Sequence, residues 1–131
     1  MMGSKVPNAA RIVLAGVRLV NGSVALFAPA TFARKLGVAP EENGPAIYAL
    51  RLFGVRTILI GSELLSRNPE VRARAVRVAV RVHLSDTLAA AAAGATLQLP
   101  KKGAKMAVIT SSLNTVLALA ARRGMPARRS R

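Results

Sequence analysis

One apolar stretch sets the class of this chain: residues 48–65 read YALRLFGVRTILIGSELL. The stretch is long and apolar enough to cross a bilayer, whose hydrocarbon core takes about 20 residues of helix. It nevertheless carries Arg51, Arg56 and Glu63. Because an ionisable side chain at the bilayer centre costs about 2.5–3.5 kcal/mol on insertion scales, such groups face a bundle interior and find partners there. We therefore expect the rest of the chain to supply those partners.

The overall composition agrees with membrane helices. The chain has 131 residues, the size of one domain, and 52% of them are hydrophobic while only 3% are aromatic. Soluble cores of this size lean on large aromatic side chains, whereas tightly packed membrane helices are built from smaller residues. Because cysteine is absent, disulfides, thiol nucleophiles and thiolate metal sites are excluded.

The formal net charge of +15 raises the alternative of nucleic-acid binding. However, Lys and Arg gather at the ends of apolar runs and in the C-terminal tail, as they do beside membrane helices. Few aromatic side chains lie among them to stack on bases. A soluble basic helical protein that binds nucleic acid is therefore the least favoured of three interpretations.

Four apolar runs predict an all-α domain over residues 10–121, an antiparallel bundle of four transmembrane helices. We expect residues 1–9 to form an N-terminal cytoplasmic segment and residues 122–131 to form a basic tail. None of the seven prolines falls inside the predicted helices, as expected because Pro breaks a helix interior. The predicted helices cover residues 10–28, 46–66, 70–99 and 104–121.

Prolines and glycines mark the connections between these helices. After Pro29, residues 30–37 predict a short amphipathic helix at the interface that ends at Gly37. Residues 38–45 predict a loop, Asn68-Pro69 ends the second helix, and residues 97–105 predict a turn.

The distribution of Lys and Arg predicts the topology. An even number of spans places both termini on one side, and the more basic side is cytoplasmic. We therefore expect a multi-pass protein of the bacterial inner cell membrane with both termini in the cytoplasm. The predicted cytoplasmic side carries Lys5, Arg11, Arg67, Arg72, Arg74, Arg122, Arg123, Arg128, Arg129 and Arg131, and the other side carries Arg34, Lys35, Lys101, Lys102 and Lys105.

Helical geometry matches the charges of the second predicted helix with groups on the third. With 1.5 Å of rise per residue, Arg56 lies about 15 Å from the cytoplasmic end and Asp86 about 12 Å, while Glu63 lies about 5 Å and His83 about 7 Å from it. Because the two helices run in opposite directions, we predict two complementary pairs at matching depths, Arg56 with Asp86 and Glu63 with His83.

A basic stripe occupies another face of the third predicted helix. Arg74, Arg77 and Arg81 recur at i, i+3 and i+7. His83 and Asp86 lie on roughly the opposite face, by the 100° advance per residue. We expect the arginines to extend toward lipid phosphates and His83 and Asp86 to face the interior.

Each predicted helix contributes polar groups near the middle of the bilayer. In this candidate layer three arginines face two carboxylates, and a buried cation without a partner is strongly disfavoured. The surplus suggests an anionic group, which could be a lipid phosphate, a substrate carboxylate or an acidic residue of a partner protein. The candidate residues are Arg18, Asn21, Arg51, Arg56, Glu63, His83, Asp86 and Asn114.

Two interpretations of this layer stay open. In one, ion pairs and hydrogen bonds only fix which helices pair and in what register. In the other, the layer lines a pocket for an anionic or quinone-like amphiphile, or relays protons through His83, Asp86 and Glu63.

Metal and hydrolytic chemistry are disfavoured. One His and no Cys leave too few ligands for zinc or iron. A Ser-His-Asp arrangement of Ser85 or Ser111 with His83 and Asp86 lacks a nucleophile elbow. We therefore expect no catalytic residue and no cofactor, and we favour a non-enzymatic protein.

Three segments resemble the small four-helix membrane proteins of the DoxX-like group. They are Gly22 with Pro29 and residues 32–37, residues 48–56 with Gly61, and the motif His83-Leu-Ser-Asp86. The likeness covers about residues 10–121 and implies the four-span topology. Members of that group are mostly integral membrane proteins of unknown function, some of them linked to redox or quinone chemistry. The resemblance therefore implies a redox- or quinone-associated membrane component as an alternative function.

The leading function is an integral membrane protein with a buried polar and ionic layer. Its expected partners are the bilayer and an anionic lipid. A membrane protein for which this chain is an accessory subunit, or a second copy of the chain, is the other kind of partner that fits the surplus charge.

Overall fold

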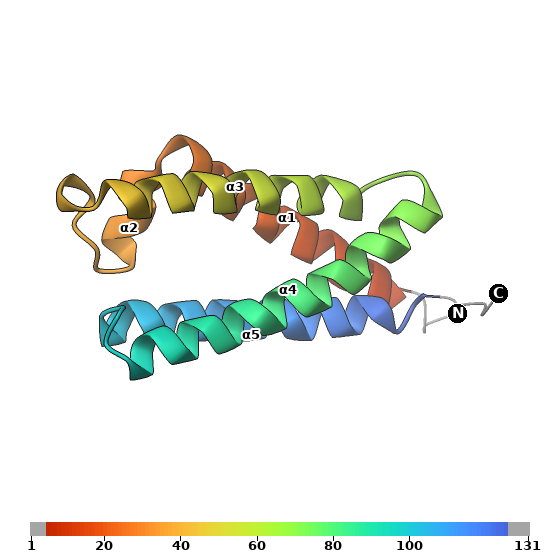
Figure 1. Ribbon diagram of the computed structural model, residues 1–131. Helices are drawn as coiled ribbons and strands as arrows, with labels where there is room; N and C mark the ends of the chain where they lie inside the picture. The colour runs from red at the N-terminus through yellow and green to blue at the C-terminus, as the bar shows by residue number, and fades with distance from the viewer. Residues whose placement is uncertain (1–4, 126–131) are drawn as a thin grey trace.

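The computed structural model describes residues 5–125, and this part of the chain is all-helical without strands (Figure 1). Most of the predicted tail, residues 126–131, lies outside the described residues. The elements are α1 (Lys5–Phe27), α2 (Pro29–Lys35), the short 3-10 helix η2 (Pro40–Glu42), α3 (Gly44–Leu64), α4 (Pro69–Ala95) and α5 (Lys101–Arg122).

Proline and asparagine define where the long helices begin. Pro45 and Pro69 lie at the first positions of α3 and α4, where the missing N–H costs nothing. The side chain of Asn43 accepts from the N–H of Ala46, and that of Asn68 caps α4 in the same way. α1 begins earlier than predicted, because Pro7 is tolerated in a first turn whose N–H groups have no intrahelical acceptor.

The turn between α4 and α5 is shorter than predicted. α4 ends at Ala95 rather than near residue 99, and α5 begins at Lys101 rather than at residue 104. Leu97 adopts a left-handed backbone with φ 58°, and the N–H of Gln98 bonds back to the Ala93 carbonyl. This backbone conformation and hydrogen bond close the end of α4, and Pro100 then caps the start of α5.

The long helices pack as two pairs (Figure 1). α1 makes its most extensive contacts with α3, and α4 with α5, while α1 also touches α5 and α3 makes fewer contacts with α4. Within the first pair, a Cβ on Gly54 would lie 2.7 Å from the Gly22 carbonyl oxygen. Within the second, a Cβ on Gly94 would lie 2.8 Å from the Ala104 Cβ. Small residues thus let the backbones approach closely in both pairs.

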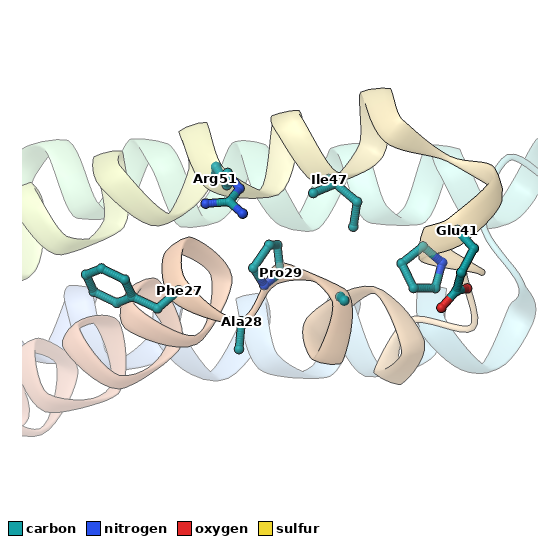
Figure 2. A pocket seen from close by; sticks show the side chains of 8 residues that line it. Phe27, Ala28, Pro29, Glu41, Ile47 and Arg51 are labelled. Carbon is teal, nitrogen blue, oxygen red and sulfur yellow. The ribbon is translucent and has the colours of Figure 1, made fainter.

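α2 and η2 form a compact connection between α1 and α3. Pro29 opens α2 and is buried, and a shallow open cavity of about 440 Å³ lies between this connection and the start of α3 (Figure 2). The rim of the cavity includes Phe27, Glu41 and Ile47. Leu36, just after α2, approaches so closely that no side chain larger than that of Gly103 fits on α5 at this point.

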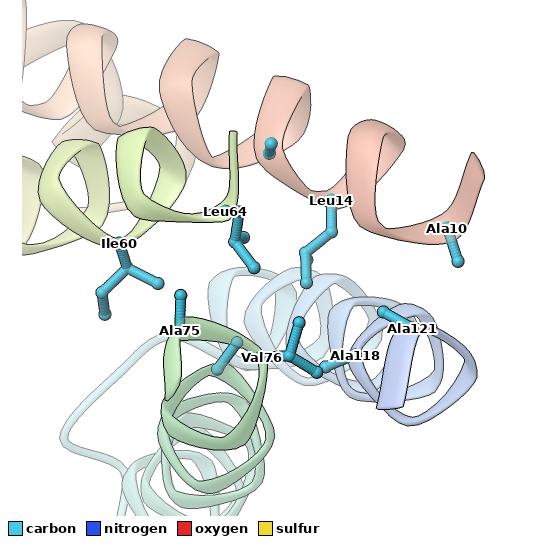
Figure 3. Packing of buried hydrophobic residues seen from close by; sticks show 10 residues of the cluster. Ala10, Leu14, Ile60, Leu64, Ala75, Val76, Ala118 and Ala121 are labelled. Carbon is cyan, nitrogen blue, oxygen red and sulfur yellow. The ribbon is translucent and has the colours of Figure 1, made fainter. Parts of the chain in front are cut away.

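The apolar core lies toward the end where α1 starts and α5 ends, which we call the terminal half (Figure 3). Its fully buried large apolar side chains are Leu14, Leu64 and Val76. We call the opposite end, with α2, η2 and the α4–α5 turn, the loop half. Core residues come from all four long helices: Ala10, Leu14, Ala15, Ile60, Leu64, Ala75, Val76, Ala79, Ala118 and Ala121.

Three of the described helices, α1, α3 and α5, are long and apolar enough to cross a membrane. Most of their residues are not buried, and the exposed ones include large apolar side chains such as Val13, Leu59 and Leu113. α4 is longer but falls short in composition, because four arginines with His83 and Asp86 offset its alanine run. The structure therefore supports three of the four predicted spans on length and composition.

Candidate functional site

Arg18 of α1 and His83 of α4 form the centre of a buried polar layer. Only 2% of Arg18 is exposed, and His83 is also buried. Arg18 Nη1 donates to His83 Nε2. Because a guanidinium carries only donors, the imidazole nitrogen is the acceptor in this contact.

Two small or short residues of α3 make room for Arg18. A Cβ on Gly61 would lie 3.3 Å from the Arg18 Cβ, so glycine leaves space where the arginine side chain passes α3. Thr57, one turn earlier on the same face of α3, is 2% exposed. Arg18 in this way reaches α4, with which α1 makes little backbone contact.

Asn114 of α5 is also buried, so every long helix contributes to the polar layer of Arg18, Thr57, His83 and Asn114. Asn21 is half-buried on α1. Thr57 was not among the predicted site residues, because a lone Thr in an apolar run has no distinctive pattern. Its spacing of four residues from Gly61, which puts Thr57 and Gly61 on one face of the helix, is the signal that sequence analysis could have used.

The predicted pair of Arg56 and Asp86 is present at the edge of this layer. Arg56 Nη2 lies 3.3 Å from Asp86 Oδ1, and the two side chains are 50% and 28% exposed. The guanidinium carbon of Arg56 also lies 5.8 Å from the centre of the Phe53 ring, within the range of a cation–π contact. The pair thus joins α3 to α4 on the surface of the bundle rather than in its interior.

The predicted pair of Glu63 and His83 is wrong. Glu63 Oε1 instead lies 3.0 Å from Arg74 Nη2, while His83 is occupied by Arg18. Matching depth does not ensure matching direction, since Glu63 lies about 200° around α3 from Gly61, the residue that faces Arg18. Arg74, which was predicted to extend toward lipid phosphates with Arg77 and Arg81, therefore forms an ion pair with Glu63 instead.

Arg51 lies away from the layer, which corrects its predicted place there. It is exposed and donates to the carbonyl of Leu26 at 3.4 Å. It projects into the region between α3 and the end of α1, beside the cavity of Figure 2. A position near the start of α3 puts Arg51 in the loop half, well away from the level of Arg18.

Ser85, His83 and Asp86 are not arranged as a catalytic triad. The Ser85 hydroxyl donates to the Arg81 carbonyl of its own helix at 2.7 Å. His83 accepts from Arg18, and Asp86 pairs with Arg56. Each group thus has a partner other than those that nucleophilic catalysis would need.

One edge of the Arg18 guanidinium has no partner among the described residues. Its Nε and Nη2 are buried without a hydrogen bond, and so is the hydroxyl oxygen of Thr57. Nε–H and Nη2–H lie side by side on one edge of the planar group, a spacing that fits the two oxygens of a carboxylate or phosphate. A buried charge without such acceptors is costly.

Comparisons of the chain with protein-family models, with curated proteins and with solved structures found no match. The likeness to the DoxX-like group stays a prediction from the sequence. Function is therefore inferred from the geometry of the polar layer and the packing of the helices.

Proposed function

We propose that this chain is an integral membrane protein whose four long helices cross the bilayer as an antiparallel bundle and that binds the anionic group of an amphiphile at Arg18. The proposal is non-enzymatic. The observation that carries it is the buried edge of Arg18, whose Nε and Nη2 have no acceptor among the described residues.

Packing supports a fourth span in α4. α4 contacts α5 from Gly94, beside Ala104, to Val76, which shares the core cluster with Ala118. If α5 crosses the bilayer, α4 follows it through the same depth. The charges of α4 are compatible with this, because Arg74 and Asp86 are paired with residues of α3 and exposed arginines reach the interface along their alkyl stems.

The burial of Arg18 favours an amphiphile over a helix of another protein. A partner helix cannot contact a side chain that is only 2% exposed without opening the bundle. A headgroup is smaller than a helix and needs only a local opening of the bundle beside Arg18, and Leu84 and Leu88 of α4, which are exposed, would then lie against its acyl chain. The acyl chain would then replace lipid contacts with apolar side chains, at little cost in free energy.

The test is native mass spectrometry of the protein extracted gently from its own membranes, after washing them with carbonate. We expect the protein to stay in the membrane and to retain one anionic amphiphile. Arg18→Gln should lose the amphiphile, and Arg81→Gln, which removes an exposed cation of α4, should keep it. Arg18→Lys keeps the charge but not the paired N–H groups, so it should bind more weakly.

The other outcomes separate the alternatives. Release by carbonate would contradict membrane insertion. A quinone instead of an anionic amphiphile would support the redox-associated interpretation, and a stoichiometric protein partner would indicate an accessory subunit.

A purely structural role is the second candidate, and a specific observation favours it. The three polar links of α4, to Arg18, Arg56 and Glu63, all join it to the α1–α3 pair. Such links fix the register of two helix pairs without any ligand. Wild-type protein that carries no amphiphile, and loses thermal stability when Arg18 is replaced, would support this role instead.

A further inference from the structure

We propose that a basic cavity at the terminal end of the helices binds the headgroup phosphate of an anionic phospholipid. The inference rests on the proposed membrane insertion but concerns a site separate from Arg18. The cavity has a volume of about 410 Å³ and lies between the start of α1, the start of α4 and the end of α5. Its lining includes three cations, Lys5, Arg11 and Arg72, and the polar side chain of Asn8.

Neutral acceptors hold two of these cations in place. Arg11 donates to the Leu64 carbonyl at the end of α3 and, at 2.6 Å, to Asn8 Oδ1. Arg72 Nη1 donates to the carbonyls of Ser66 and Arg67 at 2.8 and 3.2 Å. These bonds orient the guanidinium groups without neutralising them. The site is therefore preorganised for an anion, which reduces the entropy lost on binding.

The positive charge of the cavity is not balanced from within it. No carboxylate is among its lining residues in the described part of the chain. At the same end, Glu63 is paired with Arg74, and Glu70, in the first turn of α4, is exposed and outside the lining. Carbonyls at a helix end carry about half an elementary charge together, which is less than the charge of three cations. An anion in the cavity would relieve the mutual repulsion of Lys5, Arg11 and Arg72.

The position and the apolar lining indicate a lipid rather than a free phosphate. The cavity lies at the ends of α1 and α5, two candidate spans, and so at the level of the headgroups when these helices cross the bilayer. Pro7, Ala121 and Met125 supply apolar surface beside the cations, which suits the glycerol and first methylenes of a phospholipid. Gly124 allows the close approach that shapes this wall, since its Cβ would lie 2.6 Å from the Pro7 Cβ.

The apolar core separates this cavity from the polar layer. Arg11 and Arg18 are seven residues apart on one face of α1, about 10 Å along its axis. Leu14 lies between them and is fully buried with Leu64 and Val76. One lipid headgroup cannot contact both arginines, so binding at the cavity and binding at Arg18 can be measured independently.

The experiment is native mass spectrometry of the full chain in detergent micelles titrated with phosphatidylglycerol, with phosphatidylcholine in a parallel titration. We expect wild-type protein to retain phosphatidylglycerol in preference to phosphatidylcholine. Arg11→Gln with Arg72→Gln should weaken this binding at least about tenfold, as expected for the loss of charged hydrogen bonds. Arg122→Gln, an exposed cation at the same end but outside the lining, is the matched control and should bind like wild type.

The same variants yield the results that would overturn the site. Equal retention of the two lipids by wild type, or unchanged binding of phosphatidylglycerol in the double variant, would contradict the proposed site. Displacement of the lipid by millimolar inorganic phosphate would indicate a site for soluble phosphate. Loss of the lipid in Arg18→Gln but not in the double variant would place it in the polar layer, and the proposed function would then stand without this cavity.

A second measurement tests the site if the double variant of Arg11 and Arg72 folds poorly. Phosphatidylglycerol should raise the thermal unfolding temperature of wild type and of Arg122→Gln more than that of Gly124→Ala, which keeps the Arg18 site but whose added methyl group distorts the cavity wall without removing charge. A rise in Gly124→Ala equal to that of wild type would contradict binding in this cavity.

Discussion

The two ends of the molecule are held together in different ways. In the terminal half, large side chains such as Leu14, Leu64 and Val76 meet between the helix pairs and are fully buried. In the loop half the buried apolar residues are small, for example Ala33 and Ala104, and helices meet where glycine allows close approach. Side-chain packing therefore joins the two helix pairs in the terminal half, while close backbone approach within each pair organises the loop half.

The polar layer lies at the boundary between these halves. Arg18 follows Leu14 by one turn of α1, and Thr57 precedes Ile60 on α3. The layer therefore marks the level beyond which the pairs no longer share an apolar core. An arginine can occupy this level because Gly61 leaves space beside it.

Truncation of a core leucine should give the largest change in the free energy of unfolding and the clearest difference between the two halves. Leu64→Ala in the terminal half should lower the free energy of unfolding by about 2–5 kcal/mol, the cost of a cavity in a packed core. Leu88→Ala in the loop half, where the side chain is 65% exposed, should change it by less than about 0.5 kcal/mol. Reversible unfolding in mixed micelles measures both, and equal losses would contradict the division into two halves.

Replacing glycine by alanine should show how much the close approach of helix backbones in the loop half contributes to stability. A Cβ on Gly54 meets backbone atoms of Gly22 and Leu26 at 2.7 Å, so Gly54→Ala should cost about 1–3 kcal/mol through overpacking. Gly16 has nothing within 4 Å of its Cβ position. Gly16→Ala should therefore stabilise α1 by about 0.5–1 kcal/mol through helix propensity alone. Thermal unfolding of the two variants in detergent should move in opposite directions.

The Arg56–Asp86 pair tests how much an ion pair contributes to stability at the boundary between the two halves. Asp86→Asn should destabilise the bundle, and Arg56→Gln added to it should recover part of the loss. The interaction free energy should be about 0.6 kcal/mol and no more than about 1.7 kcal/mol, the range found for polar contacts between membrane helices. A double-mutant cycle measures it, and strictly additive losses would show that the two groups do not interact.

The ion pair of Arg34 with Glu41 should give the smallest effect, confined to the loop half. The pKa of Glu41 is lowered, first by a hydrogen bond to its own backbone and second by Arg34. A carboxyl with a lowered folded-state pKa stabilises the fold above its ordinary pKa and loses that contribution as the pH falls through the lowered value. NMR titration should find the Glu41 pKa below the ordinary value of a glutamate, and Arg34→Gln should raise it only in part.

Much of this arrangement could be predicted from local patterns. Apolar runs bounded by Pro29, Pro69 and Pro100 predicted helices that overlap the observed ones, because proline is disfavoured in a helix interior and tolerated in the first turn. The depths of Arg56 and Asp86 predicted their pairing, because the rise per residue is constant along a helix. Four-span insertion, orientation and the likeness to the DoxX-like group stay predictions.

The remaining features depend on how the helices are rotated about their axes. Depth alone could not show that Glu63 turns toward Arg74 while His83 receives Arg18, since rotation follows from packing around Gly61 and Leu64. For the same reason, positions along the helices could not predict that Lys5, Arg11 and Arg72 line one cavity.

The amino-acid sequence by itself determined roughly where the long helices form and how far along its own helix each charge lies, because hydropathy, proline and helical rise act within a single segment. Only the tertiary structure decided which charges meet, which edge of Arg18 has no acceptor and where the apolar core ends. Those properties depend on the mutual rotation and close approach of helices far apart in the chain, which side-chain volume and glycine contacts determine together.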